Sequence, residues 1–332
     1  MKQTEYIGVG AISHLAEIVS ELSPQKVFLV TGKGSYTTSG AAQPVANALA
    51  GIDVLHYTDF KELPLHEDIQ KGIEVYTAYH PDLIIAVGGG HVMDMAKAIN
   101  FFAGKKPLIA IPTTAGTGSE ATQFAVVYKD GHKSSLEHEE IIPTFAIVDP
   151  HLAMSVPKDT ALACALDALC QAIESLWSNK ATDESRTYAR QALEAIWGSI
   201  IPAIEEKNPA AITALCFGAH LSGKAINISK TTACHALSYG LTYRFGVPHG
   251  TAASIFLPGV WAYNNFSCPN PSITAETVKE LLQRFGIKNL SQFGVTAADI
   301  PSLAAEVNVE RLGNNPRAVS KEDVVQFYTE IL

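Results

Sequence analysis

Cysteine is scarce in this chain, and the few cysteines do not form a recognisable framework. There are five of them, and no two have the Cys-x-x-Cys spacing: Cys164, Cys170, Cys216, Cys234 and Cys268. A set of disulfides needs pairs, and a thiolate zinc site needs closely spaced cysteines. We therefore exclude both kinds of site and expect the thiols to act as small apolar side chains.

Basic residues and long apolar runs are also in short supply. The chain has 24 Lys and Arg against 33 Asp and Glu, whereas broad binding to nucleic acid or to an anionic membrane needs a basic surface. No run approaches the roughly 18 uninterrupted apolar residues of a membrane span. The opening segment, MKQTEYIGVG, has no apolar signal-peptide core. We expect a cytoplasmic protein that binds neither nucleic acid nor membrane.

The composition is typical of a compact globular protein, and the predicted secondary structure changes near residue 157. Of 332 residues, 47% are hydrophobic and 17% are charged, and this length suffices for two domains. Residues 1–156 alternate β-rich and helical patterns, which predicts an α/β domain with a parallel sheet covered on both faces. Residues 157–332 contain long helical patterns with few β-branched runs, which predicts an all-helical domain. Two prolines in DPHLAMSVPKD mark the boundary.

Apolar periodicity predicts the individual elements. Strands are expected at 26–31, 52–57, 82–87, 107–111, 124–128 and 145–149, with helices at 12–22, 40–50, 66–79 and 91–102. In the second half, helices are expected at 159–178, 184–205, 208–228, 250–265, 274–286 and 320–331.

A run of three glycines separates a predicted strand from a predicted helix. The candidate cofactor contacts at this turn are Gly88, Gly89, Gly90, His91 and Asp94. Glycine lets a ligand approach the backbone, and the free amides of a helix N-terminus suit a pyrophosphate. A tight turn that only needs positive φ explains the glycines equally well, because the run lacks the GxGxxG pattern.

The loop IPTTAGTGSE, residues 111–120, follows the next predicted strand. Thr113, Thr114 and Thr117 supply hydroxyls on a flexible turn, which suits contacts to sugar or phosphate. Two such loops at the carboxyl ends of neighbouring parallel strands form the place where an open α/β sheet binds nucleotides. The first half is therefore expected to bind a dinucleotide.

A third loop, TGKGSY at 31–36, bears on the choice of cofactor. The end of an early strand is where such folds distinguish a free ribose hydroxyl from a 2′-phosphate, commonly with an acid for the former. No acid is present here, and Gly32, Lys33 and Ser35 offer an amide, an ammonium and a hydroxyl. This composition favours NADP over NAD. An ordinary glycine turn is the alternative.

Two histidines stand out in the stretch HALSYGLTYRFGVPHG. His235 and His249 are fourteen residues apart, with Tyr239 between them. Imidazole is the commonest side-chain ligand of divalent first-row metals. Taken singly, each histidine is more often a core or surface residue, so the pair alone does not establish a metal site.

The segment 161–177 strengthens the metal hypothesis. As a helix, it places Asp167, Gln171 and Glu174 on a narrow polar stripe that Ala and Cys border, with no Lys or Arg beside it. A solvated face normally carries mixed charges. We therefore expect the stripe to line a buried site.

Five motifs occur in the order found in the iron-containing (group III) alcohol dehydrogenases, and the chain resembles that family from residue 27 to about 260. The motifs are GGGHVMDMAKAIN, IPTTAGTGSEAT, AIVDP at 146–150, DALCQAIES and HALSYGLTYRFGVPHG. The resemblance implies the dehydroquinate synthase-like fold of that family. It also implies a cleft between the two domains for a nicotinamide cofactor and one divalent metal, Fe²⁺ or Zn²⁺, and sheet edges paired into a homodimer.

The resemblance also assigns roles to residues of this chain. Asp167, His235 and His249 fall on three of the family's four metal ligands. Cofactor contacts fall on Gly88, Gly89, Thr113 and Thr114, and Lys133 falls close to the nicotinamide ribose. The turn TGKGS is similar to that of NADP-dependent butanol dehydrogenases in the family.

Three positions depart from the family pattern. Gln171 stands where the fourth metal ligand is a histidine, and it is the candidate fourth ligand here, because an amide oxygen can ligate a metal, although more weakly than imidazole. His91 replaces a serine after the glycines. Tyr239 replaces the histidine of the proton relay, so that Tyr239 or an ordered water is expected to deliver the proton.

The predicted reaction is reversible reduction of a small aldehyde by hydride from the nicotinamide. HALSY, GKAIN at 223–227 and ESLWSNKA at 174–181 resemble phosphonoacetaldehyde reductases most, which implies an aldehyde with an anionic tail. Candidate cations for that tail are Lys224, Lys230, Arg244 and His220, each of which is also explained as a surface or helix-end charge. Two alternatives stay open: a dehydroquinate synthase-like lyase, and a degenerate site at Gln171 and Tyr239 that binds nucleotide without turnover.

Overall fold

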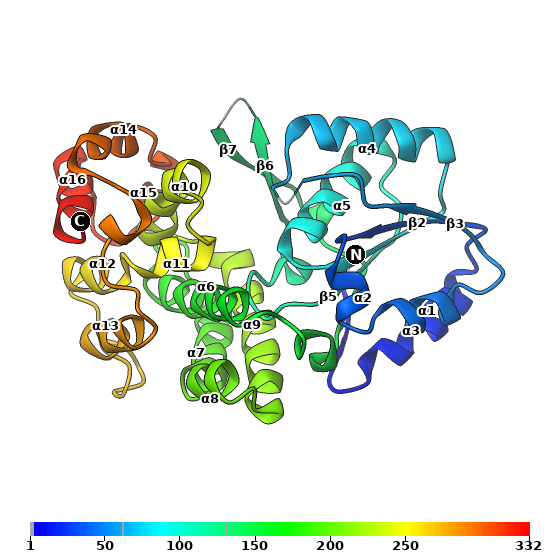
Figure 1. Ribbon diagram of the computed structural model, residues 1–332, viewed down its shortest axis with the longest axis horizontal. Coiled ribbons are helices and arrows are strands. Elements are labelled where there is room, and N and C mark those ends of the chain that lie inside the picture. The colour runs from blue at the N-terminus through cyan, green and yellow to red at the C-terminus, as the bar shows by residue number, and fades with distance from the viewer. Residues whose placement is uncertain (1–2, 62, 130–131) are drawn as a thin grey trace.

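The computed structural model describes residues 3–61, 63–129 and 132–332, without the side chains of residues 129, 132 and 133. The predicted contact of Lys133 with the nicotinamide ribose therefore lies outside the described side chains. Figure 1 shows a sheet with its covering helices on the right and a helical half on the left. This arrangement confirms the predicted fold class, an α/β half followed by a helical half.

The sheet has six parallel strands in the order β1-β8-β5-β4-β2-β3. Their bounds are β1 (Thr4–Ile7), β2 (Lys26–Thr31), β3 (Asp53–Tyr57), β4 (Leu83–Gly88), β5 (Leu108–Pro112) and β8 (Phe145–Val148). The chain runs from β2 outward to β3 and returns on the other side of β2 to form β4. The strand order thus reverses between β2 and β4, where an open α/β sheet forms a ligand crevice at the carboxyl ends of its strands.

Helices cover both faces of the sheet, as its nearly continuous apolar strands require. Alternate residues of β4 face opposite ways: Ile85 packs with α1 (His14–Leu22) and α3 (Ala42–Ala48), whereas Ile84 packs with α4 (His66–Tyr79) and α5 (Gly90–Ala103). A short helix, α2 (Ser35–Thr38), follows β2.

The segment predicted as a sheet strand at 124–128 is instead part of a separate hairpin. It forms β6 (Phe124–Lys129), which pairs antiparallel with β7 (His132–Glu137). Only residues 130 and 131 separate the two, and so short a connection permits antiparallel pairing alone. The hairpin lies between the two halves in Figure 1. Strand β1 was not predicted, and β7 was not either.

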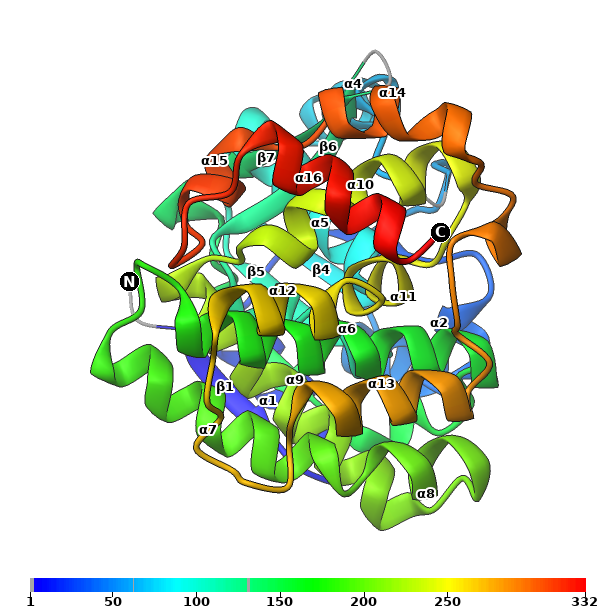
Figure 2. The same ribbon diagram turned by 90° about the vertical axis from the view of Figure 1, so that its left-hand side faces the viewer.

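The helical half is organised around α6 (Lys158–Trp177), which packs against α7 (Asp183–Trp197), α9 (Pro209–Ser229) and α11 (His249–Ser254). Figure 2 shows α6 crossing the molecule between α7 and α9 on one side and α10 (Ala233–Phe245) on the other. The remaining helices are α8 (Ile200–Glu205), α12 (Leu257–Asn264), α13 (Ala275–Arg284), α14 (Ile300–Ala305), α15 (Val309–Gly313) and α16 (Lys321–Glu330). Short 3-10 turns are η1 (Ala11–Ser13), η2 (Ser119–Ala121), η3 (Glu139–Ile141), η4 (Pro150–Ala153), η5 (Ser291–Phe293) and η6 (Ala297–Asp299).

Two long predicted helices are each divided in two. The segment 184–205 forms α7 and α8, with Gly198 and Ser199 between them, and 250–265 forms α11 and α12. Helices α10, α14 and α15 were not predicted. The predicted domain boundary falls between η4 and α6. In the part of the chain that the structure describes, no helix combines the length and the apolar character needed to cross a bilayer.

The two halves touch along a seam between the loop at 111–120 and α9. A Cβ added to Gly223 would lie 2.5 Å from the carbonyl oxygen of Gly118, and a Cβ on Gly118 would lie 2.5 Å from the Cα of Gly223. Neither position has room for a side chain, so backbone packs directly on backbone.

A buried ion cluster ties the same seam together. Nδ1 of His220, on α9, lies 3.1 Å from Oε1 of Glu120, and its Nε2 lies 3.5 Å from Oε2 of Glu5 on β1. Nζ of Lys224 lies 2.8 Å from Oε1 of Glu5. Burial lowers the pKa of His220, but its contacts with Glu120 and Glu5 outweigh burial and raise that pKa to about 9.

The raised pKa of His220 predicts a loss of stability in alkali. The stabilisation from protonated His220 is fully present below its ordinary pKa of 6.5 and disappears as the pH rises through about 9. We expect the free energy of unfolding to fall by roughly 1–3 kcal/mol across this window relative to a His220→Gln variant. Urea unfolding at several pH values measures the difference, and parallel pH profiles for the two proteins would contradict the prediction.

Candidate active site

The three glycine- and threonine-containing loops meet at the crevice between β2 and β4. Thr31 and Val87 are paired in register at the ends of these strands, so the loops that follow them are neighbours. The amide of Thr113 donates to the carbonyl of Gly88 over 2.9 Å, which joins the loop at 111–120 to the glycine run. The structure thus brings together Gly32, Lys33, Ser35, Gly88, Gly89, Gly90, His91, Thr113, Thr114 and Thr117.

This crevice has features that fit a dinucleotide. Gly89 and Gly90 stand at the N-terminus of α5, where free amides face the end of β4. The side-chain oxygen of Thr113 is buried and has no hydrogen-bond partner among the described residues. Such an orphaned group is expected to be satisfied by a ligand or water. Lys33 is exposed at the rim.

Asp94 is placed differently from the other candidate cofactor contacts. Its Oδ1 accepts from the hydroxyl of Ser119 over 2.7 Å, and its Oδ2 accepts from the amide of Val126 over 3.1 Å. Nearby, buried Lys97 donates to the carbonyls of Thr122 and Phe124 over 2.7 and 2.9 Å. Asp94 and Lys97 therefore hold the segment that leads into β6, and the carboxylate of Asp94 is already occupied by protein donors.

The polar stripe of α6 lines a buried site, as the sequence suggested. Asp167, Gln171 and Glu174 are 3%, 4% and 0% exposed, although they lie on a helix otherwise packed with apolar side chains. Buried polar groups need partners. Those partners come from α9, α10 and the loop at 111–120.

Asp167, His235 and His249 converge although they are far apart in the sequence. Their ligand atoms all lie within 4.8 Å of one another, and Nε2 of His235 lies 3.1 Å from Oδ1 of Asp167. The two imidazole centroids are 5.4 Å apart. One carboxylate and two imidazoles form a donor set that suits Fe²⁺ or Zn²⁺.

Both histidines lie at the beginning of a helix. His235 lies in the first turn of α10, and His249 is the first residue of α11. The next residue, Gly250, packs against α6 so closely that an added Cβ would lie 1.9 Å from the carbonyl oxygen of Ala163 and 2.7 Å from Cβ of Asp167. The absence of a side chain at Gly250 is what lets His249 approach Asp167.

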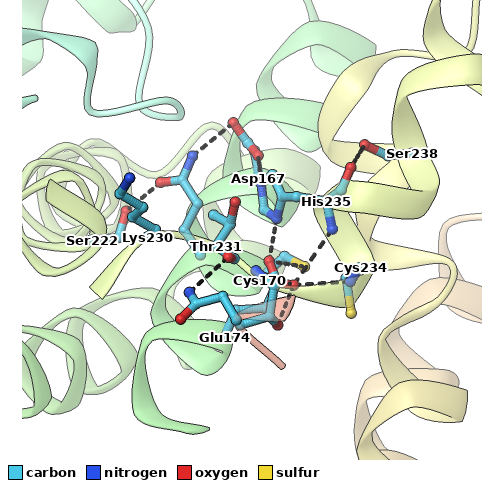
Figure 3. Close-up of polar contacts among 12 residues, drawn as sticks. Asp167, Cys170, Glu174, Ser222, Lys230, Thr231, Cys234, His235 and Ser238 are labelled. Atoms are coloured by element: carbon cyan, nitrogen blue, oxygen red, sulfur yellow. Dashed lines mark hydrogen bonds and ion pairs between the residues drawn. The ribbon is translucent and has the colours of Figure 1, made fainter. Parts of the chain in front are cut away.

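Glu174 orients the imidazole ring of His235 from the side opposite Asp167. Its Oε1 accepts from the hydroxyl and amide of Thr232, over 2.7 and 3.1 Å, and from the amide of Cys234 over 2.9 Å, while its Oε2 contacts Nδ1 of His235. Figure 3 shows His235 between Glu174 and Asp167. Burial raises the pKa of Glu174, but His235 and Thr232 outweigh burial and lower it below its ordinary value. A carboxylate on one imidazole nitrogen directs the other nitrogen toward a metal.

A second group of potential metal ligands shares His235 with the group of Asp167, His235 and His249. Ligand atoms of Cys170, Glu174 and His235 are also within 4.8 Å of one another. The carboxylate of Glu174 is already engaged by the start of α10, and burial raises the pKa of the Cys170 thiol well above its ordinary value. We therefore assign this group to packing and to the support of His235.

The aromatic side chains beside the metal ligands come from both halves. Tyr239, one turn after His235, stacks on His249 with centroids 6.1 Å apart. Tyr243, one further turn along α10, stacks on Tyr128 of β6 at 5.8 Å. The hairpin thus closes against the helix that carries His235 and Tyr239.

The four cations suggested for an anionic tail all have acidic partners. Lys224 pairs with Glu5, Lys230 with Glu137 and Glu310, Arg244 with Asp299 and Glu306, and His220 with Glu120 and Glu5. These interactions explain the four charges without a ligand, so the structure does not favour them as a tail receptor.

Two residues of interest were missed or left without a role. The sequence placed Glu174 on the polar stripe but assigned no role to it. Its position on α6, two turns after Asp167 and without a basic neighbour, was the signal that could have indicated a role beside the metal ligands. Arg311, on α15, gave no signal in the sequence. It is 8% exposed, its guanidinium lies 5.3 Å from the ring centroid of Phe124, and no carboxylate of the described residues forms an ion pair with it.

Comparison with known proteins identifies the family. The model described as iron-containing alcohol dehydrogenase matches residues 3–150, and the model of that family's C-terminal part matches residues 161–272. The chain belongs to the iron-containing alcohol dehydrogenase family. It is 32% identical to the phosphonoacetaldehyde reductase of Streptomyces viridochromogenes over 304 residues, which cover 76% of this chain and 77% of that protein.

Two further relatives extend over nearly the whole chain. The NAD-dependent methanol dehydrogenase of Bacillus methanolicus is 28% identical to this chain, and the match covers 98% of this chain and 97% of that protein. The sulfoacetaldehyde reductase of Bifidobacterium kashiwanohense, solved in complex with NAD⁺, is 27% identical, with a TM-score of 0.89 over 99% of this chain and 96% of that chain.

Membership in the iron-containing alcohol dehydrogenase family confirms several expectations from the sequence. The protein is a nicotinamide-linked oxidoreductase of alcohols and aldehydes, and the family finding supports NAD(H), a metal and small aldehyde or alcohol substrates. It favours a dehydrogenase over a dehydroquinate synthase-like lyase. The roles of individual residues stay predictions.

Gly250→Ala tests whether close packing of α11 on α6 assembles the metal ligands. The added Cβ would overlap Ala163 and Asp167, so α11 must move away from α6. We expect a loss of about 1–3 kcal/mol in the free energy of unfolding and weaker metal binding in competition with a chelator. Gly259→Ala is the control, because its Cβ would meet nothing nearer than Phe327 at 4.0 Å. Equal metal affinity in the two variants would contradict the prediction.

Proposed function

We propose that this protein is an NADPH-linked reductase of small aldehydes that carry an anionic group, with one divalent metal held by Asp167, His235 and His249. The observation that carries the proposal is the convergence of these three side chains within 4.8 Å. The relatives named for phosphonoacetaldehyde and sulfoacetaldehyde support the substrate class. The carboxylate and imidazole donors suit both Fe²⁺ and Zn²⁺.

The chain's own residues have distinct parts in this proposal. When bound, the metal supplies Lewis acidity at the carbonyl oxygen and the nicotinamide supplies hydride. Asp167 contributes a charged oxygen donor, and Glu174 keeps Nε2 of His235 directed toward Asp167. Tyr239, stacked on His249, is the proposed donor of the proton that the substrate oxygen receives.

The preference for NADPH follows from the loop after β2. Lys33 is exposed beside the glycine-containing turn, and no acidic residue of the segment 31–36 would repel a 2′-phosphate. The relative sulfoacetaldehyde reductase was solved in complex with NAD⁺, which supports a nicotinamide cofactor for this fold.

For the anionic group, we propose Arg311 as the receptor. It is 8% exposed and has no acidic ion-pair partner among the described residues, so its charge is available to an anionic ligand. Its neighbour Phe124 begins β6, and α15 packs on α10, the helix that carries His235 and Tyr239. A fixed guanidinium suits phosphonate, sulfonate or carboxylate oxygens.

We also propose a homodimer. Strand β1 forms an edge of the sheet, with β8 as its single neighbour in the described structure, and Ile7 is 38% exposed. An unpaired edge strand is a template for pairing with a second chain. Sedimentation equilibrium distinguishes a dimer from a monomer.

The cytoplasmic location of the protein stays a prediction.

Steady-state reduction of short aldehydes tests the proposed function. Phosphonoacetaldehyde and sulfoacetaldehyde are compared with neutral propionaldehyde, with NADPH and NADH in turn, using protein loaded with Fe²⁺ or Zn²⁺. We expect the highest kcat/KM for an anionic aldehyde with NADPH. His249→Ala should abolish turnover while NADPH binding persists. Binding of NADPH without reduction of any aldehyde would instead indicate a degenerate site.

Replacing Arg311 tests the receptor. Because hydrogen bonds to charged groups contribute about 1.5–3 kcal/mol, Arg311→Met should lower kcat/KM for anionic aldehydes by roughly 10- to 150-fold and change propionaldehyde reduction little. Arg244→Met removes a cation that already pairs with Asp299 and Glu306, and serves as the matched control. A similar loss for charged and neutral aldehydes would refute the assignment.

A further inference from the structure

The side chain of Gln171 is held at both ends of its amide. Nε2 lies 3.1 Å from Oδ2 of Asp167 and 3.4 Å from the carbonyl oxygen of Thr117. At the other end, Oε1 lies 3.0 Å from the hydroxyl of Ser222 on α9. Gln171 is 4% exposed, so water does not replace these partners.

The chemistry of the neighbours determines which way the amide points. The carboxylate of Asp167 and the carbonyl of Thr117 only accept hydrogen bonds, so the end that faces them must be the NH₂ group, with its two donors. The hydroxyl of Ser222 lies 3.0 Å from Oε1 of Gln171 and 2.9 Å from the carbonyl oxygen of Ala219, so the end of the amide that faces Asp167 and Thr117 decides the orientation. A reversed amide would place Oε1 against two acceptor oxygens and leave all three without a donor. The two acceptor oxygens of Asp167 and Thr117 therefore fix the orientation of the Gln171 amide.

We infer that Gln171 is not the fourth metal ligand but a positioning residue for Asp167, and that this protein holds its metal with three protein ligands. With NH₂ toward Asp167, the amide oxygen of Gln171 faces Ser222, away from the three converging ligand atoms. Gln171 occupies Oδ2 of Asp167, and Oδ1 is the oxygen that faces His235. The inference rests on the proposed metal site and changes its composition.

Two consequences follow from a three-ligand set. Catalytic metal sites with three protein ligands keep positions open for water or substrate. One imidazole fewer also means weaker retention of the metal, so a chelator should remove it more readily than from a four-ligand site. A Gln171→His variant should gain a ligand, because it restores the histidine expected at this position from the family pattern.

Cobalt substitution tests the inference without any reliance on turnover. Co²⁺ alone is bound to the metal-free protein, and its visible absorption reports the number and type of ligands. We expect Gln171→Leu to leave the wild-type band positions unchanged, because no ligand is lost, and to weaken Co²⁺ binding by about 10- to 100-fold through loss of the support to Asp167. Gln171→His should shift the bands and bind Co²⁺ more tightly than wild type.

Ser222→Ala provides a matched control. It removes the partner of Oε1 and leaves every proposed ligand in place, so it should weaken Co²⁺ binding less than Gln171→Leu and leave the bands unchanged. NADPH binding by all three variants, measured by fluorescence, shows that each has folded.

The outcomes separate this inference from the proposed function. A shifted spectrum in Gln171→Leu would show that Gln171 ligates the metal, and would overturn the inference. Equal Co²⁺ affinity in wild type and Gln171→Leu would show that Gln171 does not position Asp167, and would overturn it as well. Unchanged bands in Gln171→Leu and shifted bands in Gln171→His, in a protein that reduces no aldehyde, would support the inference and overturn the proposed function.

Discussion

A buried carboxylate on α6, which faces the start of α10, holds the candidate site together. Glu174 has no exposed surface, so its charge must be balanced entirely by protein groups. The first amides of α10 and the hydroxyl of Thr232 provide that balance, and the helix N-terminus adds a favourable dipole. The same contacts fix α10 against α6. His235 is therefore positioned by the requirement to compensate Glu174, before any metal binds.

The polar contacts around Glu174 extend across three helices. The hydroxyls of Ser175 and Ser229 are 2.8 Å apart, and the indole nitrogen of Trp177 donates to Thr232 over 2.8 Å. Apolar contacts alone allow helices to slide, whereas paired polar groups are satisfied at one register only. The small side chains bordering the stripe on α6 leave room for this network. The position of α9 and α10 along α6 is thereby specified.

Much of the sheet could be predicted from the sequence because its strands are buried on both faces. Strands β2, β4, β5 and β8 read as nearly continuous apolar runs, and that burial is a property of each strand by itself, whereas β3 contains the exposed residues Asp53 and His56. Strand β1 gave no such signal, since its four residues are exposed or half-buried and it is defined by its pairing with β8. The hairpin was assigned to the wrong sheet because apolar alternation does not identify a strand's partner.

The candidate metal ligands were predictable as residue types, but their surroundings were not. Helix α10 was missed because HALSYGLTYRF has no clear apolar period and contains Gly240, a poor helix former. Its first amides are held by Glu174, which lies 59 residues before the start of the helix. The pairing of the four suggested cations and the isolation of Arg311 likewise depend on side chains distant in the chain. Tertiary contacts of this kind leave no local pattern.

The glycine seam between Gly118 and Gly223 limits how the two halves can move. Backbone resting on backbone cannot be compressed, and the adjacent charges of His220 and Glu120 resist separation. We expect any relative motion of the two halves to be smaller at this seam than at the contact between Tyr128 and Tyr243, which stacks two rings and involves no charged pair.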